Sequence, residues 1–168
     1  MQKLDKTSQA TLHTFRERER QGHLPPLTLK YDEQQGFYVE AACNMQELTL
    51  VAEYLGQVRT GAQTLNDTND SIMELLCHKR QADGSEDPEQ SLVIVPYQFA
   101  NAARFFNGIN NSKKGSKKTV QNIKSMRCQV DGKATVLIFT KRAVKKGEVL
   151  VYDYNEAGKN MYPTSHFL

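Results

Sequence analysis

The sequence Arg-Phe-Phe-Asn-Gly-Ile-Asn-Asn occupies residues 104–111, and Gly-Glu-Val-Leu-Val-Tyr-Asp-Tyr follows at residues 147–154. The first segment contains an Asn-Gly pair, which is typical of a tight turn. The second continues from a glycine into β-branched and aromatic residues, which favour a strand. We therefore expect a turn that carries Asn107 and a strand that carries Tyr152 and Tyr154.

Short β-type runs separated by polar turns predict further strands on both sides of these segments. We expect strands over residues 27–31, 36–40, 48–54, 91–95, 121–130, 134–141 and 149–154. The first three are predicted to form an antiparallel meander. Asp131-Gly132 indicates a two-residue hairpin, and the apolar run at residues 134–139 is predicted to be central.

Short helices complete the predicted fold, whose class is mainly β with short helices (α+β). Residues 8–21 are predicted to form a charged helix with Ser8 as its N-cap, ended by Gly22. Apolar pairs at helical spacing favour a second helix within residues 65–78. Residues 97–105 are predicted to be a third, short helical segment.

The composition is that of a single globular domain. The chain has 168 residues, of which 39% are hydrophobic and 24% are charged, and one core is usual at this length. No apolar run is long enough to cross a bilayer, and the first residues lack the apolar run of a signal peptide. We expect a soluble monomer with no membrane partner.

The three cysteines, Cys43, Cys77 and Cys128, are far apart in the sequence and odd in number. This pattern argues against a disulfide framework and favours a reducing compartment, the cytosol or the nucleus. Neither Cys-x-x-Cys nor His-x-x-His spacing occurs, so we expect no metal site. A net charge of +3 is too small to indicate nucleic-acid binding by itself.

Four segments resemble, in the right order, SET-domain protein lysine methyltransferases: residues 35–38, 53–56, 104–111 and 147–154. More narrowly, Phe-x-Asn-Gly-Ile-Asn-Asn, Tyr-Asp-Tyr-Asn and the ending at residues 162–168 look like the plant trithorax-related histone H3 lysine-27 monomethyltransferases and their protist relatives. The resemblance covers residues 17–168. It implies a SET-domain fold of small antiparallel sheets with a C-terminal pseudoknot, S-adenosylmethionine as the cofactor, and a nuclear location.

The resemblance also divides the chain into three parts. Residues 1–24 form an N-terminal helical segment, residues 25–155 the SET domain, and residues 156–168 a C-terminal segment that completes the active site. The chain lacks the cysteine-rich, zinc-binding post-SET segment by which many relatives close the lysine channel. Tyr162, His166 and Phe167 are the candidates to close it here.

Three tyrosines match the family positions that handle the target lysine. Tyr154 matches the catalytic tyrosine, whose hydroxyl lies near the transferring methyl group. Tyr152 matches the Tyr/Phe position that tunes the number of methyl groups, where tyrosine is associated with monomethylation. Tyr54 matches a channel tyrosine that orients the target amine. Substrate binding is accordingly expected from Tyr54, Tyr152, Tyr162 and His166.

Cofactor binding is implied for the early glycine segment, the asparagine turn and the last strand. The residues are Gly36, Phe37, Tyr38, Arg104, Phe105, Asn107, Gly108 and Tyr154. Asn107 and Gly108 match an Asn-His pair, and the glycine leaves only backbone contacts at the second position. Gln35 stands in the Gln-Gly pair where many SET domains have Lys-Gly, so Arg104 is the candidate partner for the cofactor carboxylate.

A lysine-rich run places Lys113, Lys114, Lys117 and Lys118 within six residues. Gly115 and Ser116 interrupt it, which predicts a loop. The loop is either simply solvated or a contact to nucleosomal DNA phosphates, which would be independent of sequence and sensitive to salt.

The resemblance thus implies an S-adenosylmethionine-dependent histone H3 lysine N-methyltransferase that binds the H3 N-terminal tail and monomethylates lysine 27. Two alternatives stay open. The chain could methylate a non-histone lysine, or it could be a non-catalytic module that binds a histone tail or a nucleosome.

Overall fold

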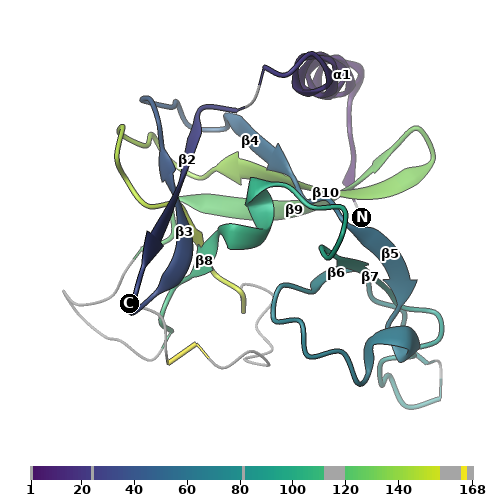
Figure 1. Cartoon of the computed structure of the whole chain (residues 1–168). Helices are drawn as coiled ribbons and strands as arrows, with labels where there is room; N and C mark the ends of the chain where they lie inside the picture. Colours follow the sequence, from purple (N-terminus) through teal and green to yellow (C-terminus); the bar gives the residue numbers. More distant parts are fainter. Residues whose placement is uncertain (1, 24, 81, 112–119, 156–163, 166–168) are drawn as a thin grey trace.

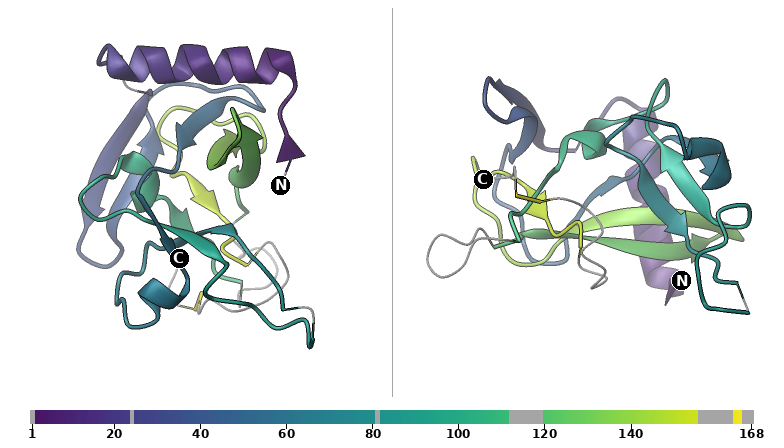
Figure 2. Two further views of the ribbon diagram at one scale, coloured as in Figure 1. Left: turned by 90° about the vertical axis from the view of Figure 1, so that its right-hand side faces the viewer. Right: turned by 90° about the horizontal axis from the view of Figure 1, so that it is seen from below.

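The computed structural model describes residues 2–23, 25–80, 82–111, 120–155 and 164–165. The strands of these residues form four small sheets, and the one α-helix among them, α1, lies along one side of the domain (Figures 1 and 2). This arrangement confirms the predicted class, mainly β with short helices.

The largest sheet has the strand order β1-β9-β10-β4. Its strands are β1 (Gln2–Lys3), β9 (Ile123–Val130), β10 (Lys133–Thr140) and β4 (Leu50–Glu53). β9 and β10 are joined by Asp131-Gly132, whose φ angles of 50° and 75° are those that a two-residue hairpin turn requires. The predicted hairpin is confirmed.

The predicted central position of residues 134–139 is also confirmed. β10 pairs with β9 on one edge and with β4 on the other. Val136, Leu137 and Ile138 are essentially fully buried, with side chains that alternate between the two faces of the sheet. Val136 and Ile138 join the main core, whereas Leu137 joins a smaller cluster on the opposite face.

The predicted meander is wrong in its third strand. β2 (Leu27–Asp32) and β3 (Gly36–Ala41) do form an antiparallel hairpin, but β4 pairs with β10 and belongs to another sheet. Val51, Ala52 and Glu53 of β4 are all buried, so this strand needs cover on both faces. Pairing with β10 brings Val51 and Ala52 into the main core, which adjacency in sequence does not reveal.

The helix predicted within residues 65–78 is also wrong. A short 3₁₀ turn, η1 (Ala62–Thr64), comes first, and Met73–Leu76 forms strand β6. β6 packs in a sheet of order β5-β7-β6 with β5 (Gln57–Thr60) and β7 (Leu92–Val95). Burial in β6 alternates along the strand, so the period is two and the apparent helical spacing is an accident of a short window.

The remaining predictions hold in part. Of the helical segment at residues 97–105, only the 3₁₀ turn η2 (Ala102–Phe105) forms, capped by the Asn101 side chain. The last strand is reduced to β11 (Val151–Tyr152). Its partner is β8 (Asn107–Gly108), so the Asn-Gly pair that was predicted to be a turn is a short strand instead.

Helix α1 (Lys6–Arg20) begins two residues earlier than predicted, and Asp5 is its N-cap. A side-chain oxygen of Asp5 accepts the backbone N–H of Ser8 at 2.7 Å, so Ser8 is not the cap. The chain leaves the helix at Gly22, whose φ is +80°, as predicted. Leu12 is 1% exposed and packs in the smaller cluster with Leu4, Cys128, Val130 and Leu137.

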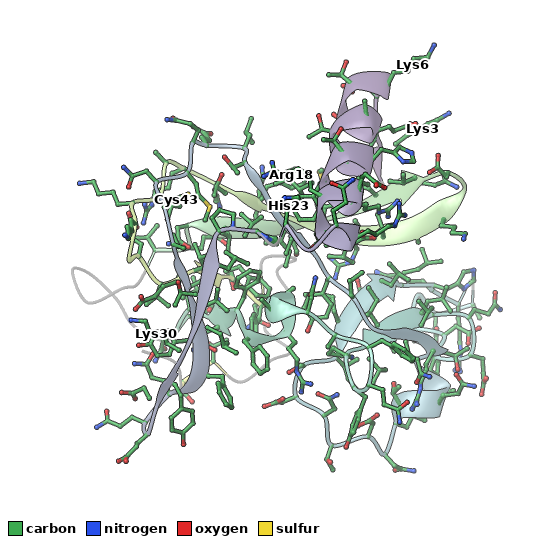
Figure 3. The ribbon with its side chains drawn as sticks, turned by 45° about the horizontal axis from the view of Figure 1, so that its top comes forward. Lys3, Lys6, Arg18, His23, Lys30 and Cys43 are labelled. Carbon is green, nitrogen blue, oxygen red and sulfur yellow. The ribbon has the colours of Figure 1, made fainter. Side chains whose placement is uncertain are left out.

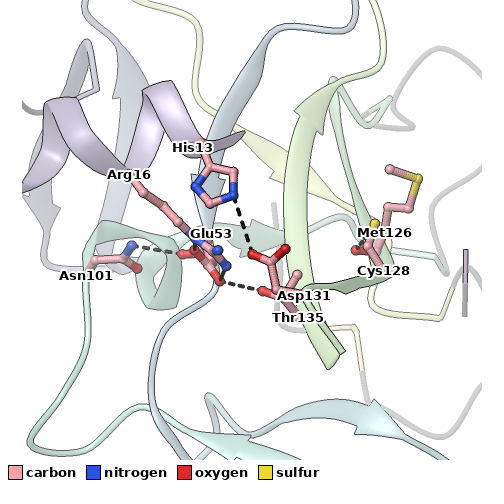
Figure 4. A network of polar contacts seen from close by, with 8 residues as sticks. All are labelled: His13, Arg16, Glu53, Asn101, Met126, Cys128, Asp131 and Thr135. Atoms are coloured by element: carbon pink, nitrogen blue, oxygen red, sulfur yellow. Dashed lines mark hydrogen bonds and ion pairs between the residues drawn. The ribbon is translucent and has the colours of Figure 1, made fainter. Parts of the chain in front are cut away.

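An ion pair adds a second anchor between α1 and the central sheet (Figure 4). Arg16 donates two hydrogen bonds to the Glu53 carboxylate, at 2.9 and 2.7 Å, and the Thr135 hydroxyl donates a third at 2.5 Å. Burial acts to raise the pKa of Glu53. The hydrogen bonds from Arg16 and Thr135 and the charge of Arg16 outweigh it, so the pKa lies below its ordinary value.

The three cysteines are free: Cys43 is exposed (Figure 3), Cys77 is half-buried and Cys128 is buried. No helix within the described ranges is long and apolar enough to span a membrane. In the same part of the chain, no group of three His, Cys, Asp or Glu side chains is placed to hold a metal ion.

Replacing Leu12 by alanine should weaken the docking of α1. A buried leucine truncated to alanine loses its transfer free energy and leaves a cavity, so the free energy of unfolding should fall by about 2 to 5 kcal/mol. Urea unfolding measures this value. The matched control Leu65→Ala removes a side chain that is 73% exposed and should change it by less than about 0.5 kcal/mol. Equal effects of the two substitutions would contradict the packing of Leu12.

The Arg16–Glu53 pair predicts a pH dependence of stability. Because the folded pKa of Glu53 lies below the ordinary value of 4.5, the pair stabilises the fold above pH 4.5 and is lost as the pH falls through the folded pKa. In Arg16→Gln the burial of Glu53 instead raises its pKa. The difference in unfolding free energy between wild type and Arg16→Gln should therefore be largest near neutral pH and shrink in acid. A difference that stays constant from neutral pH to acid would rule out this linkage.

Candidate active site

Residues 107–108 and 151–152, far apart in the sequence, lie side by side. β8 pairs with β11 in parallel, so that Asn107 is opposite Val151 and Gly108 is opposite Tyr152. The backbone N–H of Ile109 donates to the carbonyl of Tyr152 at 3.0 Å. The asparagine segment and the tyrosine strand therefore form one unit.

The Asn122 side chain binds the edge of β11 that does not pair with β8. Sequence reasoning did not identify this residue. Its side-chain N–H donates to the Val149 carbonyl at 2.8 Å, and its side-chain oxygen accepts the N–H of Val151 at 2.9 Å. Its own backbone N–H donates to the Val151 carbonyl. A side chain that is 2% exposed thus takes the place of a neighbouring strand and explains why β11 is so short.

The three candidate catalytic tyrosines gather beside this pairing. Tyr54 and Tyr152 are buried, Tyr154 is partly exposed, and the rings of Tyr152 and Tyr154 have centroids 4.6 Å apart. The Tyr154 hydroxyl donates to the Phe106 carbonyl at 2.7 Å, and the Tyr54 hydroxyl donates to the Ser71 carbonyl at 2.5 Å. The sequence offered no signal for these two acceptors, because a backbone carbonyl is common to every residue.

Burial raises the pKa of the Tyr152 hydroxyl well above its ordinary value, and the neighbouring phenols of Tyr154 and Tyr54 add to the rise. Burial also raises the pKa of Tyr54, an effect that the positive charge of Arg104 opposes in part. Both groups therefore stay un-ionised at neutral pH. The result is a cluster of neutral phenols with a cation close to Tyr54.

Arg104 and Phe105 of η2 lie between the tyrosines and the β2–β3 hairpin. The Arg104 guanidinium carbon is 5.2 Å from the Phe105 ring centroid, a cation–π distance, and the rings of Phe105 and Phe37 are 5.3 Å apart. Phe37 is 50% exposed. The structure thus brings together Phe37, Arg104 and Phe105.

The backbone conformation of the turn between β2 and β3 explains the glycine at position 36. Gly36 opens β3 opposite Asp32 and has a φ of +72°, which favours glycine. Among the described residues, a Cβ at this position would meet no atom within 4 Å, so backbone conformation accounts for the glycine without a close approach. Tyr38 is half-buried on β3, opposite Lys30.

A buried polar group of η2 fits a polar ligand such as S-adenosylmethionine. The Nε of Arg104 is buried and has no hydrogen-bond partner among the described residues. Asn107 is half-buried in the β8–β11 pairing. Buried polar groups are usually paired, so an unpaired guanidinium nitrogen beside a half-exposed aromatic ring favours an occupied state in which a ligand supplies the partner.

The end of the chain returns to the asparagine segment. The Asn110 side chain donates to the Ser165 carbonyl at 3.0 Å, and the N–H of Asn111 donates to the Thr164 hydroxyl at 3.1 Å. The Asn111 side chain also donates to Asp153 at 2.9 Å. Residues 164–165 therefore lie against the loop after β8, in keeping with the expected path of the C-terminal segment.

Several predicted site residues fall outside the described ranges. They are the channel-closing candidates and the lysine-rich run, namely Tyr162, His166, Phe167, Lys113, Lys114, Lys117 and Lys118.

Comparison with known proteins agrees with this geometry. The chain is 42% identical, over all of its 168 residues, to the histone-lysine N-methyltransferase ATXR5 of Arabidopsis thaliana, and it spans 42% of that protein's length. No family model matches the chain.

Solved structures give the same picture. The crystal structure of the ATXR5 SET domain in complex with histone H3 di-methylated on arginine 26 matches with a TM-score of 0.90 and 40% identity, covering 100% of this chain and 75% of that one. A structure of ctPRC2 bound to S-adenosylmethionine matches with a TM-score of 0.60 at 17% identity, covering 82% of this chain and 16% of that one. The second match concerns the fold alone.

The tyrosine cluster and the asparagine segment beside it agree with a match to the ATXR5 SET domain that covers the whole of this chain. The chain belongs to the family of SET-domain histone-lysine N-methyltransferases that includes ATXR5 and ATXR6.

Proposed function

We propose that this chain is the catalytic domain of an S-adenosylmethionine-dependent enzyme that adds a single methyl group to lysine 27 of histone H3. The observation that carries the proposal is the assembly of Tyr54, Tyr152 and Tyr154 beside the β8–β11 pairing. Family membership supports the reaction class. The histone H3 bound to the related SET domain supports the substrate class.

The tyrosine cluster suits the chemistry of a lysine amine. Only the neutral amine has the lone pair that attacks a methyl group, and with a reference pKa near 10.4 its deprotonation at pH 7 costs about 4 to 5 kcal/mol. Buried, un-ionised phenols offer dipoles but no negative charge to an ammonium group. Such a wall therefore favours the neutral amine and can align it by hydrogen bonding.

The chain's own residues define the proposed cofactor site. We infer that the Asn107 side chain and the Gly108 backbone bind the polar end of the cofactor, that Phe37 and Phe105 cover it, and that Arg104 faces its carboxylate. When bound, S-adenosylmethionine supplies a methyl group activated by the adjacent sulfonium. The Arg104 Nε, which is buried and has no hydrogen-bond partner among the described residues, supports this assignment.

Further parts of the proposal rest on the family resemblance. Residues 25–155 would be the SET domain, between an N-terminal segment, residues 1–24, and a C-terminal segment, residues 156–168. Tyr162 and His166 of the last segment would close the lysine channel, and Gly36 and Tyr38 would border the cofactor. The protein would act in the nucleus on the H3 tail, as a monomer, with the lysine-rich run near nucleosomal DNA.

Incubation with S-adenosylmethionine and intact histone H3, followed by mass spectrometry of the product, tests this function. A single methyl group at lysine 27 is expected. A methyl group on another H3 lysine would keep the reaction and discard the proposed site. Measurable cofactor binding with no methylation of H3 or of recombinant nucleosomes would overturn the proposal in favour of a non-histone substrate or a binding module.

Tyr154→Phe should reduce kcat by about a hundredfold or more, because the hydroxyl that orients the reacting groups is lost. Cofactor affinity, measured by calorimetry, should stay nearly unchanged, since the aromatic ring is kept. Tyr97→Phe, which changes a tyrosine that is 67% exposed, is the matched control and should retain wild-type turnover. Wild-type turnover in Tyr154→Phe would remove Tyr154 from the catalytic role.

Tyr152→Phe should let dimethylated product accumulate. Tyr152 is 7% exposed, so its hydroxyl and any water bound to it fill space that a methylated amine needs. Mass spectrometry at long reaction times reads the degree of methylation. A product that stays monomethylated despite full turnover would refute this steric account.

A further inference from the structure

Glu53 lies directly before Tyr54 and is a buried carboxylate, 8% exposed. Its side chain accepts hydrogen bonds from Arg16 of α1 and from Thr135 of β10. Its backbone carbonyl accepts the side-chain amide of Asn101 at 2.8 Å. A single residue of β4 is thus bound to three other parts of the fold (Figure 4).

The Asn101 side chain connects Glu53 to η2 through two hydrogen bonds. While its amide N–H donates to Glu53, its side-chain oxygen accepts the N–H of Ala103 at 3.2 Å and so caps the 3₁₀ turn. The same turn carries Arg104 and Phe105, which the proposed function assigns to the cofactor. The path from Arg16 to η2 therefore runs through Glu53 and Asn101 in consecutive hydrogen bonds.

On its other side Glu53 is joined to Tyr54 by the peptide bond. The backbone N–H of Tyr54 donates to the Val136 carbonyl at 2.8 Å, which fixes the strand at the point where the tyrosine enters the site. A shift of the Glu53 backbone would therefore displace both the Tyr54 ring and the Asn101 cap.

Arg16 compensates the buried negative charge of Glu53. Removing one partner of a buried ion pair leaves the other charge uncompensated, and the structure responds by protonation or by movement toward water. The Glu53 side chain is only 11% exposed and that of Arg16 is 26% exposed. Other cations of the N-terminal segment differ, since Lys3 and Lys6 are exposed and project away from the domain (Figure 3).

We propose that Arg16, on the N-terminal helix, is a positioning residue for the methyl transfer, acting through Glu53 on Tyr54 and through Asn101 on η2. The proposal rests on the proposed function. It assigns α1 a part in the alignment of the active site, although the hydrogen bonds and ion pairs described between α1 and the β-sheet region go to Glu53 and Asp131 and not to the tyrosines.

Steady-state kinetics with S-adenosylmethionine and histone H3 test the proposal on Arg16→Gln. Misplacement of Tyr54 and η2 should lower kcat and raise the KM for the cofactor, each by about tenfold. The KM for H3 should rise less than the KM for the cofactor, because Tyr54 is the residue on this path that is assigned to the substrate, whereas Arg104 and Phe105 are both assigned to the cofactor. Arg16→Lys keeps the charge and should recover part of the loss.

Arg18→Gln is the matched control, because it removes the same charge from an exposed position of the same helix and should leave all three constants unchanged. Leu12→Ala controls for loosened packing of α1. Constants for Arg16→Gln that equal those of Arg18→Gln would overturn the proposal. So would the same split of constants in Leu12→Ala, because the ion pair would then have no specific part.

Two further measurements keep the test decisive. Thr135→Val removes one hydrogen bond from Glu53 while keeping α1 in place, and it should shift the same constants in the same direction by less. Hydrogen exchange of the Ala103 and Tyr54 amides, which needs no turnover, should be faster in Arg16→Gln than in Arg18→Gln. Faster exchange in Arg16→Gln, together with no detectable activity of the wild type, would mean that the proposed function fails while the positioning role stands. Equal exchange in Arg16→Gln and Arg18→Gln would overturn the positioning role.

Discussion

The parallel pairing of β8 with β11 is the constraint on which the candidate site depends. Two residues from each strand are enough to form this pairing, because side chains bind the rest of the segment: Asn122 binds the other edge of β11, and Asn111 binds Asp153 just beyond it. The pairing sets Asn107 and Gly108 next to Tyr152, and it brings Tyr154 within reach of the Phe106 carbonyl. Segments that are remote in sequence become one surface.

Around this pairing the fold supplies neutral phenol dipoles, on which nearby charged side chains act: Arg104 and Asp70 on Tyr54, and Arg127 on Tyr152. Tyr54 and Tyr152 are held un-ionised by burial, and Arg104 is near enough to Tyr54 to oppose part of that shift. Glu53, the one charged residue that is buried in the described part of the chain, directly precedes Tyr54 and accepts hydrogen bonds from Arg16 and Thr135. The phenols themselves carry no negative charge, which suits a site that must accept a lysine amine without its proton.

Sequence reasoning predicted the local elements well where turn chemistry was explicit, as in Asp131-Gly132 and the β2–β3 hairpin. It placed β4 in the wrong sheet and predicted a helix at β6, because strand partners are chosen by burial across the whole fold. The tyrosines and Asn107 were predicted as site residues through family motifs. Asn122, Asn101 and the carbonyls of Ser71 and Phe106 were not, since amide and backbone contacts leave no periodic or compositional signal.

A crystal structure with S-adenosylhomocysteine and an H3 peptide centred on lysine 27 tests the central claim most directly. The account predicts the ligand's amino group at the Asn107 side chain and the lysine nitrogen among the hydroxyls of Tyr54, Tyr152 and Tyr154. A ligand bound away from the β8–β11 pairing, or a lysine that does not reach these hydroxyls, would contradict it.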